Sequence, residues 1–141
     1  MAGMHTLADL TTATTTAGAN STAVNLGGYW RRAIVVLDHT VSGLDAADTL
    51  DVYVDLSLDG SKWINCVHFT QKAGNAAAST EFAILDPSTP GTATVVATSD
   101  AAAAAVRPSA FGMQMRERHV IVNGAGGNAP SHTYTCKVFV Q

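Results

Sequence analysis

Five histidines are the residues of this chain that could bind a metal ion or transfer protons. They are His5, His39, His68, His119 and His132. No two of them follow an H-x-H or H-x-x-x-H spacing and none lies next to a cysteine, so the ligand spacings typical of zinc sites are missing. We therefore expect each histidine to have a structural role, while convergence of ligands in three dimensions stays open. No metal ion and no cofactor is predicted.

Nucleophiles and paired carboxylates give no stronger case for an enzyme. The chain has no G-x-S-x-G motif, and we expect Cys66 and Cys136 to be two reduced thiols in the core. Asp51 and Asp55 share one face of a predicted strand about 13 Å apart, farther than the ~5 to 9.5 Å that glycosidases use, so they are expected to solvate that face. The glycine-rich run at 124–127 lacks the G-K-[ST] ending of a phosphate loop. No catalytic residue is predicted.

Charged residues are scarce in this chain. Of its 141 residues, 13% are charged and 47% are hydrophobic, and the net charge is -3. The largest basic group is the pair Arg31 and Arg32, which is too small to predict nucleic-acid binding. No apolar run approaches the roughly 20 residues of a membrane-spanning helix, and residues 1–10 lack a secretory pattern, so we expect assembly in the cytoplasm without membrane contact. A surface with so few charges favours burial against partners.

The charges that do occur are unevenly spread along the chain. Six aspartates fall between Arg32 and Lys62 without a basic residue among them, at positions 38, 45, 48, 51, 55 and 59. Arg107, Arg116 and Arg118 follow late in the sequence. Two interpretations stay open, either two solvated faces or an acidic patch of one subunit that meets the basic strand of a neighbour.

The clearest structural pattern is a β-hairpin over residues 50–70. Hydrophobic and polar residues alternate over 50–58, which predicts a strand with one buried face. The Asp-Gly pair that follows predicts the turn, because glycine accepts the positive φ that a tight hairpin needs, and a second strand returns over 63–70. Residues 29–37 are rich in aromatic and β-branched side chains and predict a central strand covered on both faces.

The remaining segments extend the same architecture. Further strands are predicted at 81–85, 92–98, 111–123 and 132–141, and residues 100–106 could form at most two turns of helix. We predict an all-β fold, an antiparallel β-sandwich or jelly-roll of six to eight strands, because an open sheet would leave its apolar face in water. The residues expected in the core are Ile34, Val36, Leu50, Val52, Val54, Leu56, Trp63, Val67, Phe69, Val120, Val122, Val138 and Val140.

The first 28 residues differ in composition from the rest of the chain. They carry a single charge, Asp9, in a background of threonine, alanine, glycine and asparagine, and they lack periodic large apolar residues. We predict that residues 1–28 form an extended arm and that residues 29–141 form the β-sandwich domain. Contacts with neighbouring subunits would order such an arm.

Three segments together resemble one protein family, namely LGGY at 26–29, LDVYVDLSLDGSKW at 50–63 and SHTYTCKVFV at 131–140. Over residues 20–141 the general pattern is similar to small β-sandwich virion proteins of tailed bacteriophages, including head decoration or cement proteins. The resemblance implies a homotrimer on the outer capsid surface that clamps the major capsid protein, with the arm reaching a neighbouring capsomer. The residues we predict at this interface are Leu7, Leu10, Tyr29, Trp30, Arg31, Arg116 and Arg118.

The hairpin also supports a rival interpretation. The motif S-x-D-G-x-x-W at 57–63 is similar to the Asp-box of sialidases and related sugar-associated β-folds, in which it shapes a turn and packs its tryptophan inside. The motif occurs once here, in a chain too short for the propeller along which it normally recurs. An exposed Tyr29, Trp30 or Tyr53 could still stack on a sugar. A glycan- or receptor-binding module of a phage tail or fibre is therefore the alternative function.

Overall fold

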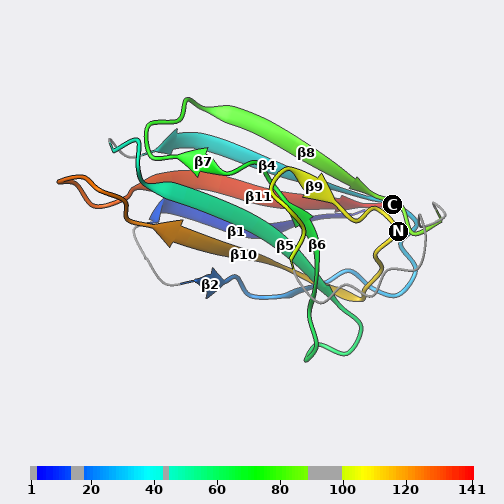
Figure 1. The fold of residues 1–141 in the computed structure, drawn as a ribbon. Coiled ribbons are helices and arrows are strands. Elements are labelled where there is room, and N and C mark those ends of the chain that lie inside the picture. Colours follow the sequence, from blue (N-terminus) through cyan, green and yellow to red (C-terminus); the bar gives the residue numbers. More distant parts are fainter. Residues whose placement is uncertain (1–2, 14–17, 43–44, 89–99) are drawn as a thin grey trace.

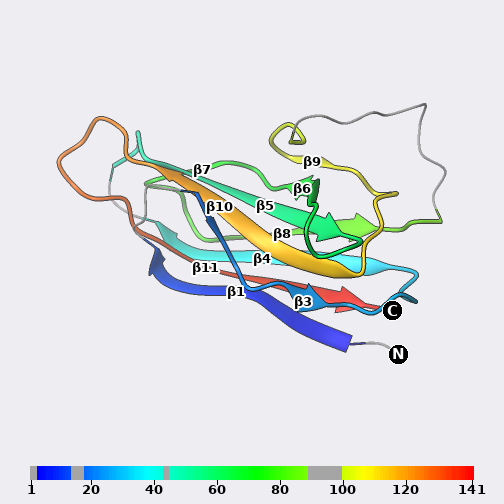
Figure 2. The ribbon, with the colours of Figure 1, turned by 90° about the horizontal axis from the view of Figure 1, so that it is seen from below.

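Eleven β-strands and no helix make up the described part of the chain in the computed structural model. The structure describes residues 3–13, 18–42, 45–88 and 100–141. The strands form two antiparallel sheets that lie one above the other, as Figure 2 shows. Of the described strands, seven have five residues or more and four have two residues. The predicted all-β fold with two packed antiparallel layers is confirmed, whereas the number of described strands exceeds the six to eight predicted, because no pattern in the sequence signals the two-residue strands.

The four-stranded sheet contains the first and the last strand of the chain (Figure 1). Its order is β1 (Gly3–Ala13), β11 (His132–Val140), β4 (Ala33–Ser42) and β8 (Ser79–Leu85). Each neighbouring pair in this sheet is antiparallel. The central strands β11 and β4 are therefore paired on both sides, whereas β1 and β8 are the edges.

The seven-stranded sheet is built around three longer strands. β5 (Thr49–Ser57) pairs with β10 (Gln114–Val122) on one side and with β6 (Ile64–His68) on the other. Two-residue strands complete this sheet: β2 (Ala19–Asn20) and β3 (Val24–Asn25) pair with β10, β7 (Lys72–Ala73) pairs with β5, and β9 (Ala105–Val106) pairs with β6. The predicted hairpin over 50–70 is thus confirmed as β5 and β6.

The turn between β5 and β6 forms as its sequence predicts. Oδ1 of Asp59 accepts hydrogen bonds from the backbone N–H groups of Lys62 and Ser61, each at 2.8 Å, and these bonds lower the pKa of Asp59 to about 2. Oγ of Ser57 accepts a hydrogen bond from the N–H of Gly60 at 2.9 Å. Gly60 has a φ of 76°, in the left-handed region that favours glycine. The motif therefore builds a tight turn without any need for a sugar.

Residues 3–13, within the predicted extended arm, form an edge strand of the four-stranded sheet. β1 pairs with β11 at eight positions, and Leu7 and Ala8 lie buried in the core. Small and polar residues suffice here because the side of β11 that faces away from β4 has main-chain hydrogen-bonding groups that need partners, and β1 supplies them. Residues 1–2 and 14–17, also within the predicted arm, lie outside the described residues.

The hydrophobic core lies between the two sheets and contains eight of the predicted core residues. These are Leu50, Val52, Val54, Leu56, Val67, Phe69, Val138 and Val140. In β4 the inward face instead carries Ala33, Val35 and Leu37, whereas Ile34 is exposed and Val36 is half-buried. The prediction that this strand is covered on both faces is wrong, because one face of the four-stranded sheet is open to solvent.

The facing of β10 also differs from the prediction. Met115 and Ile121 point into the core, whereas Val120 is half-buried and Val122 is exposed. Trp63, likewise predicted in the core, is half-buried outside it. The inward face of β10 includes Glu117, whose carboxylate accepts a hydrogen bond from the Tyr134 hydroxyl at 2.8 Å. The positions of the hydrophobic residues alone predicted the wrong buried face of β10, because this strand buries a charged residue that has its own hydrogen-bond partners.

The alanine-rich segment before Pro108 does not form the predicted short helix. Its described residues make a turn that leads into β9, and Ala104 has a φ of 60°. The strand predicted over 92–98 lies outside the described residues. The strand predicted from residue 111 begins at residue 114.

Candidate binding surfaces

Large apolar side chains cross the outer face of the four-stranded sheet from edge to edge. Met4, Phe139, Ile34 and Ile84 are direct cross-strand neighbours on β1, β11, β4 and β8. They are 59%, 44%, 37% and 44% exposed, respectively. We call these four residues the apolar row. Phe82, 69% exposed on β8, lies two residues from Ile84 on the same face.

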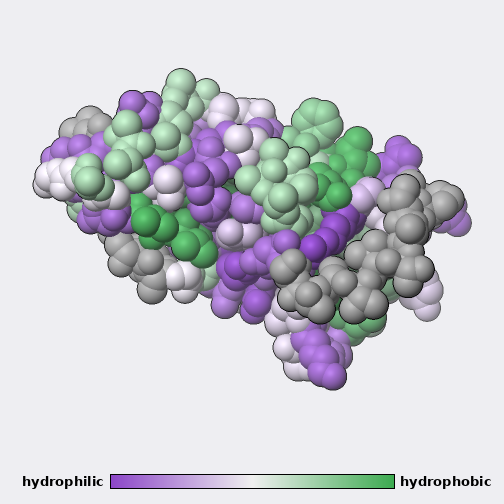
Figure 3. All heavy atoms as spheres, in the orientation of Figure 1, coloured by the Kyte–Doolittle hydropathy of each residue, from purple (hydrophilic) through white to green (hydrophobic). Residues whose placement is uncertain are grey.

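The apolar row occupies one end of its sheet. The row that contains Phe82 continues through Val36 and Lys137 to Thr6, and the row beyond it contains Thr80, Asp38, Thr135 and Asp9. Polarity therefore rises along the sheet away from the start of β1 and the end of β11, where the apolar row lies. Figure 3 shows the opposite side of the molecule, over the seven-stranded sheet, where hydrophilic and hydrophobic side chains are mixed. A partner that covers this end of the sheet would bury apolar surface and few charges.

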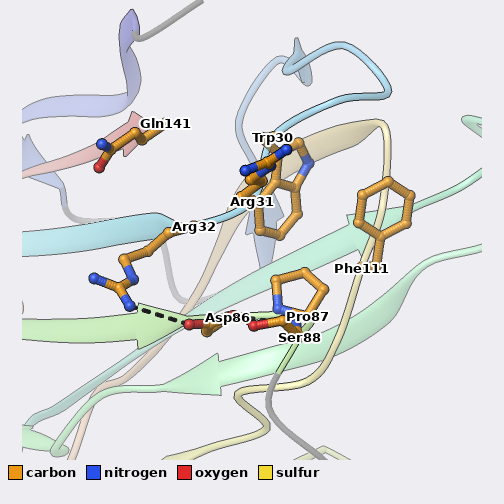
Figure 4. Close-up of a pocket in the computed structure, with 8 residues that line it drawn as sticks. All are labelled: Trp30, Arg31, Arg32, Asp86, Pro87, Ser88, Phe111 and Gln141. Atoms are coloured by element: carbon orange, nitrogen blue, oxygen red, sulfur yellow. Dashed lines mark hydrogen bonds and ion pairs between the residues drawn. The ribbon is translucent and has the colours of Figure 1, made fainter.

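A pocket of about 710 Å³ lies at the same end of the molecule (Figure 4). Trp30 stacks on Phe111 with ring centroids 5.3 Å apart, and Arg32 forms an ion pair with Asp86 at 3.2 Å. A second pocket of about 340 Å³ shares Arg32 and Gln141 with the first and is lined by Ile34 and Phe139 of the apolar row. The large pocket and the apolar row are thus parts of one hollowed surface.

Of the predicted interface residues near the start of the chain, some lie at this surface and others lie in the core. Tyr29 is 97% exposed, and Arg31 is exposed at the large pocket. Trp30 is buried, and its indole N–H donates to the carbonyl oxygen of Gly112 at 2.8 Å. Leu7 is buried and Leu10 packs against the core. Tyr29 and Arg31 therefore stay interface predictions, whereas Leu7 and Trp30 contribute to folding because their side chains are enclosed.

The remaining two predicted interface residues belong to an arginine ladder on the outer face of the seven-stranded sheet. Arg116 lies over the Trp63 ring, 4.2 Å from its centroid, and Arg118 lies over the Tyr53 ring at 4.1 Å. Both guanidinium groups form ion pairs with Asp55, at 3.4 Å and 3.1 Å. Arg118 also forms an ion pair with Asp100 at 2.8 Å. The basic strand therefore has acidic partners within its own chain.

The other aspartates of the acidic run also have partners within the chain. Asp51 accepts from Nε2 of His68 at 2.9 Å and is buried, as is Asp55, so the expectation that this pair solvates a face is wrong. Oδ1 of Asp48 accepts from the N–H of Gly124 at 2.8 Å. Asp45 binds the backbone and side chain of Asn128. These three aspartates, at positions 45, 48 and 51, thus hold loops and strands in place.

The histidines do not converge on a metal site in the described part of the chain. No group of three or more ligating side chains there could hold a metal ion. His68 bridges Asp51 and the carbonyl oxygen of Ala101, and His119 contacts Glu117 at 3.1 Å. Cys66 and Cys136 are buried free thiols, as predicted, and burial raises the pKa of both.

Two histidines lie inside the sandwich. His39 on β4 and His132 on β11 are fully buried, with ring centroids 5.8 Å apart. Neither ring nitrogen of His132 has a hydrogen-bond partner among the described residues. Burial lowers the pKa of both rings, with a further contribution from Lys72 for His39 and from His39 for His132, whose pKa falls to about 4. The sequence contained no signal for this pair, because the register that joins β4 to β11 is not visible in either segment alone.

Comparison with known proteins identifies no relative of this chain. No family model, no curated protein and no solved structure matches it. In the described part of the chain, no helix has the length and apolar character needed to span a membrane.

Proposed function

We propose that this protein is a structural virion protein that binds the outer surface of a tailed-phage capsid and stabilises it. Its partners in this proposal are the major capsid protein and further copies of itself, arranged as a homotrimer on the virion after assembly in the host cytoplasm. The class of assembly comes from the family resemblance over residues 20–141. The surface that would bind comes from the structure.

The apolar row is the observation that supports the proposal most strongly. Monomeric domains rarely expose large apolar patches unless these bind something. Met4, Phe139, Ile34 and Ile84 are joined by direct cross-strand pairing, so they form one continuous surface. Burial of such surface releases about 25 cal/mol for each Å² removed from water. A protein that works by adhesion needs a face of this kind and no reactive group.

The position of the row suits a clamp. Its central members lie on β11 and β4, which are paired on both sides and therefore hold Phe139 and Ile34 at fixed positions. A face held in this way loses little conformational freedom on binding, which preserves more of the gain from burial. Contact with two neighbouring capsid subunits at once would add avidity and resist their separation.

Binding of purified variants to phage heads tests this proposal. The heads are those of the phage that encodes the chain, prepared without it, and occupancy is counted by quantitative gel analysis. Phe139→Lys and Ile34→Lys place a charge in the apolar row and should lower affinity at least tenfold. Leu58→Lys is the matched control, because Leu58 is exposed on the β5–β6 turn outside the row, and it should bind as the unchanged protein does. Equal binding of all four proteins, or no binding by any, contradicts the proposal.

A glycan- or receptor-binding module of a phage tail or fibre is the second candidate function. It is supported by the 97% exposure of Tyr29. In the sequence, Tyr29 follows two glycines and comes directly before the first residues that line the large pocket. An exposed aromatic ring can stack on a sugar face. This candidate predicts saturable binding of the isolated protein on a glycan array and its loss in Tyr29→Ala. The capsid proposal predicts no sugar binding in either protein.

A further inference from the structure

The four edges of the two sheets are protected to different degrees. β1 carries two register shifts, between Thr6 and Ala8 and between Leu10 and Ala13, and such irregularities hinder pairing with another strand. The seven-stranded sheet ends in two-residue strands. β8 is different: it pairs with β4 over seven positions without a register shift, and it contains neither proline nor a basic residue. It is the longest regular edge among the described strands.

The phase of the backbone shows which groups of β8 point outward. Arg32 and Gln141 exchange both of their N–H···O bonds, at 3.1 Å and 2.9 Å, so the alternate residues Ala33, Val35 and Leu37 turn their backbone groups toward β8. The residues of β8 that pair with these three point their backbone N–H and C=O groups toward β4. The residues that lie between them on β8 point these groups away from β4. The N–H of Asp86, which has the outward phase, donates to the carbonyl oxygen of Pro108 at 2.7 Å and confirms this assignment.

Three residues of β8 therefore present unpaired backbone groups at the edge. They are Thr80, Phe82 and Ile84, and no backbone hydrogen bond joins their outward N–H and C=O groups to another described residue. Their side chains also share the outer face of the sheet, where Phe82 and Ile84 are exposed. Main-chain groups and apolar side chains thus converge on the same three positions.

The single charge of β8 does not protect this edge. Glu81 alternates to the other face of the strand, where its carboxylate forms an ion pair with Lys72 and accepts from the N–H of Thr70. In a twofold antiparallel pair of β8 strands centred on Phe82, Glu81 would face the partner's Ala83. The two glutamates would therefore not lie directly opposite each other, and their charges would already be neutralised.

We propose that a second copy of this chain pairs with β8 in antiparallel fashion about a twofold axis at Phe82, joining two four-stranded sheets into one. Thr80 then faces the partner's Ile84, Phe82 faces the partner's Phe82, and about six main-chain hydrogen bonds form, two for each facing pair. The outward-pointing backbone groups of positions 80, 82 and 84 are arranged symmetrically about residue 82. Two copies of this edge can therefore pair with each other. The two Phe82 side chains then pack against each other on the outer face, and the apolar row of each sheet ends at Ile84 opposite the partner's Thr80. This inference rests on the proposed structural function, and it adds a twofold contact to the implied threefold one.

The area available indicates a weak contact in dilute solution. At 69% exposure, Phe82 offers on the order of 140 Å², given that an aromatic side chain buries 150–250 Å². The area buried by both Phe82 side chains and the two strand edges stays well below the ~1,200 Å² of a stable standard interface. Main-chain hydrogen bonds must therefore supply much of the affinity. The pair should therefore depend on concentration in solution and become stable where many copies sit side by side on a surface.

Thr80→Pro and Thr80→Ala test the pairing. Proline removes the outward N–H and places its ring at the edge, whereas the β4 ladder uses other residues, so the fold is retained. In sedimentation equilibrium up to about 1 mM, a range that detects even weak association, Thr80→Ala should reach the mass of the unchanged protein and Thr80→Pro half of it. An unchanged protein that gains no twofold mass up to that concentration, or the same mass for all three proteins, overturns the inference.

Amide hydrogen exchange of the unchanged protein gives a second measurement that needs no variant. The Phe82 and Ile84 amides should gain protection as concentration rises, whereas those of Glu81 and Ala83 should be protected throughout. Free exchange at Phe82 and Ile84 in the associated protein overturns the pairing. Protection on phage heads that persists when the bound copies are too sparse to meet overturns it in favour of a strand from another protein. Pairing without binding to heads would instead refute the proposed function, and binding to heads with exposed β8 amides would refute only the pairing.

Discussion

Acid should destabilise the sandwich through His132, and replacing this residue should remove much of that sensitivity. His132 is fully buried, and its neutral form is favoured there because burial opposes charge and the neighbouring His39 ring opposes it further. The acidic group that favours the charged form, Asp48, has the smallest effect on this pKa. Protonation therefore requires a charge to enter the space between the sheets without a hydrogen-bond partner.

The magnitude follows from the shift of the pKa from 6.5 to about 4. Because the folded pKa is the lower one, the unfolded chain binds more protons between these values, and stability rises with pH across that window. The contribution of His132 is fully present above pH 6.5 and is lost as the pH falls toward 4. The loss amounts to about 2 kcal/mol at pH 5 and about 3 kcal/mol at pH 4. This is a large part of the 5–15 kcal/mol typical of a folded domain.

Urea denaturation at pH 7, 6, 5 and 4, followed by tryptophan fluorescence, measures this loss. With a urea slope of about 1–3 kcal/mol per M, the midpoint should fall by roughly 1–3 M between pH 7 and pH 4 through His132 alone. His132→Phe should show a fall smaller by that amount. His5→Gln, at a half-exposed position on β1, is the matched control and should follow the unchanged protein. Parallel pH profiles for His132→Phe and the unchanged protein would refute the reasoning.

Three further changes test the fold. Leu7→Ala should lower the free energy of unfolding by about 2–5 kcal/mol in urea denaturation, because it opens a cavity beneath β1; a loss below 0.5 kcal/mol would mean that β1 is a detachable arm. Tyr134→Phe should cost about 1.5–3 kcal/mol by removing a buried donor to the Glu117 carboxylate, and an unchanged Tm would contradict this. Gly124→Ala should lower the Tm much more than Gly127→Ala, since a Cβ at 124 would lie 2.1 Å from a backbone oxygen whereas one at 127 meets nothing within 4 Å; equal effects would contradict the loop packing.

Local patterns predicted the parts of the fold that depend on neighbouring residues. The β5–β6 hairpin follows from strict alternation and an Asp-Gly turn, both of which are contained in one short segment. The role of residues 3–13 could not be predicted in the same way, because β1 is held by an edge of β11 that lies more than a hundred residues away in sequence. The facing of β4 was missed because a continuous apolar run has no period, so it does not reveal which residues point inward.

The candidate site was predicted only in part, for a related reason. Tyr29 and Arg31 were identified as exposed aromatic and basic residues, and both lie at the surface. The apolar row was not predicted, because its members come from four strands and meet only through their register. The ion pairs of Arg116 and Arg118 with Asp55 likewise depend on the pairing of β10 with β5. The sequence showed that these residues carry opposite charges, but it did not show that they form ion pairs with each other.

Electron cryo-microscopy of the intact phage particle that encodes this chain tests the central claim most directly. The account predicts density for the two-layered sandwich on the outside of the head, with the outer face of the four-stranded sheet at Phe139 and Ile34 turned toward the major capsid protein. Density in the tail fibre, or a head on which that face points to solvent, would contradict it.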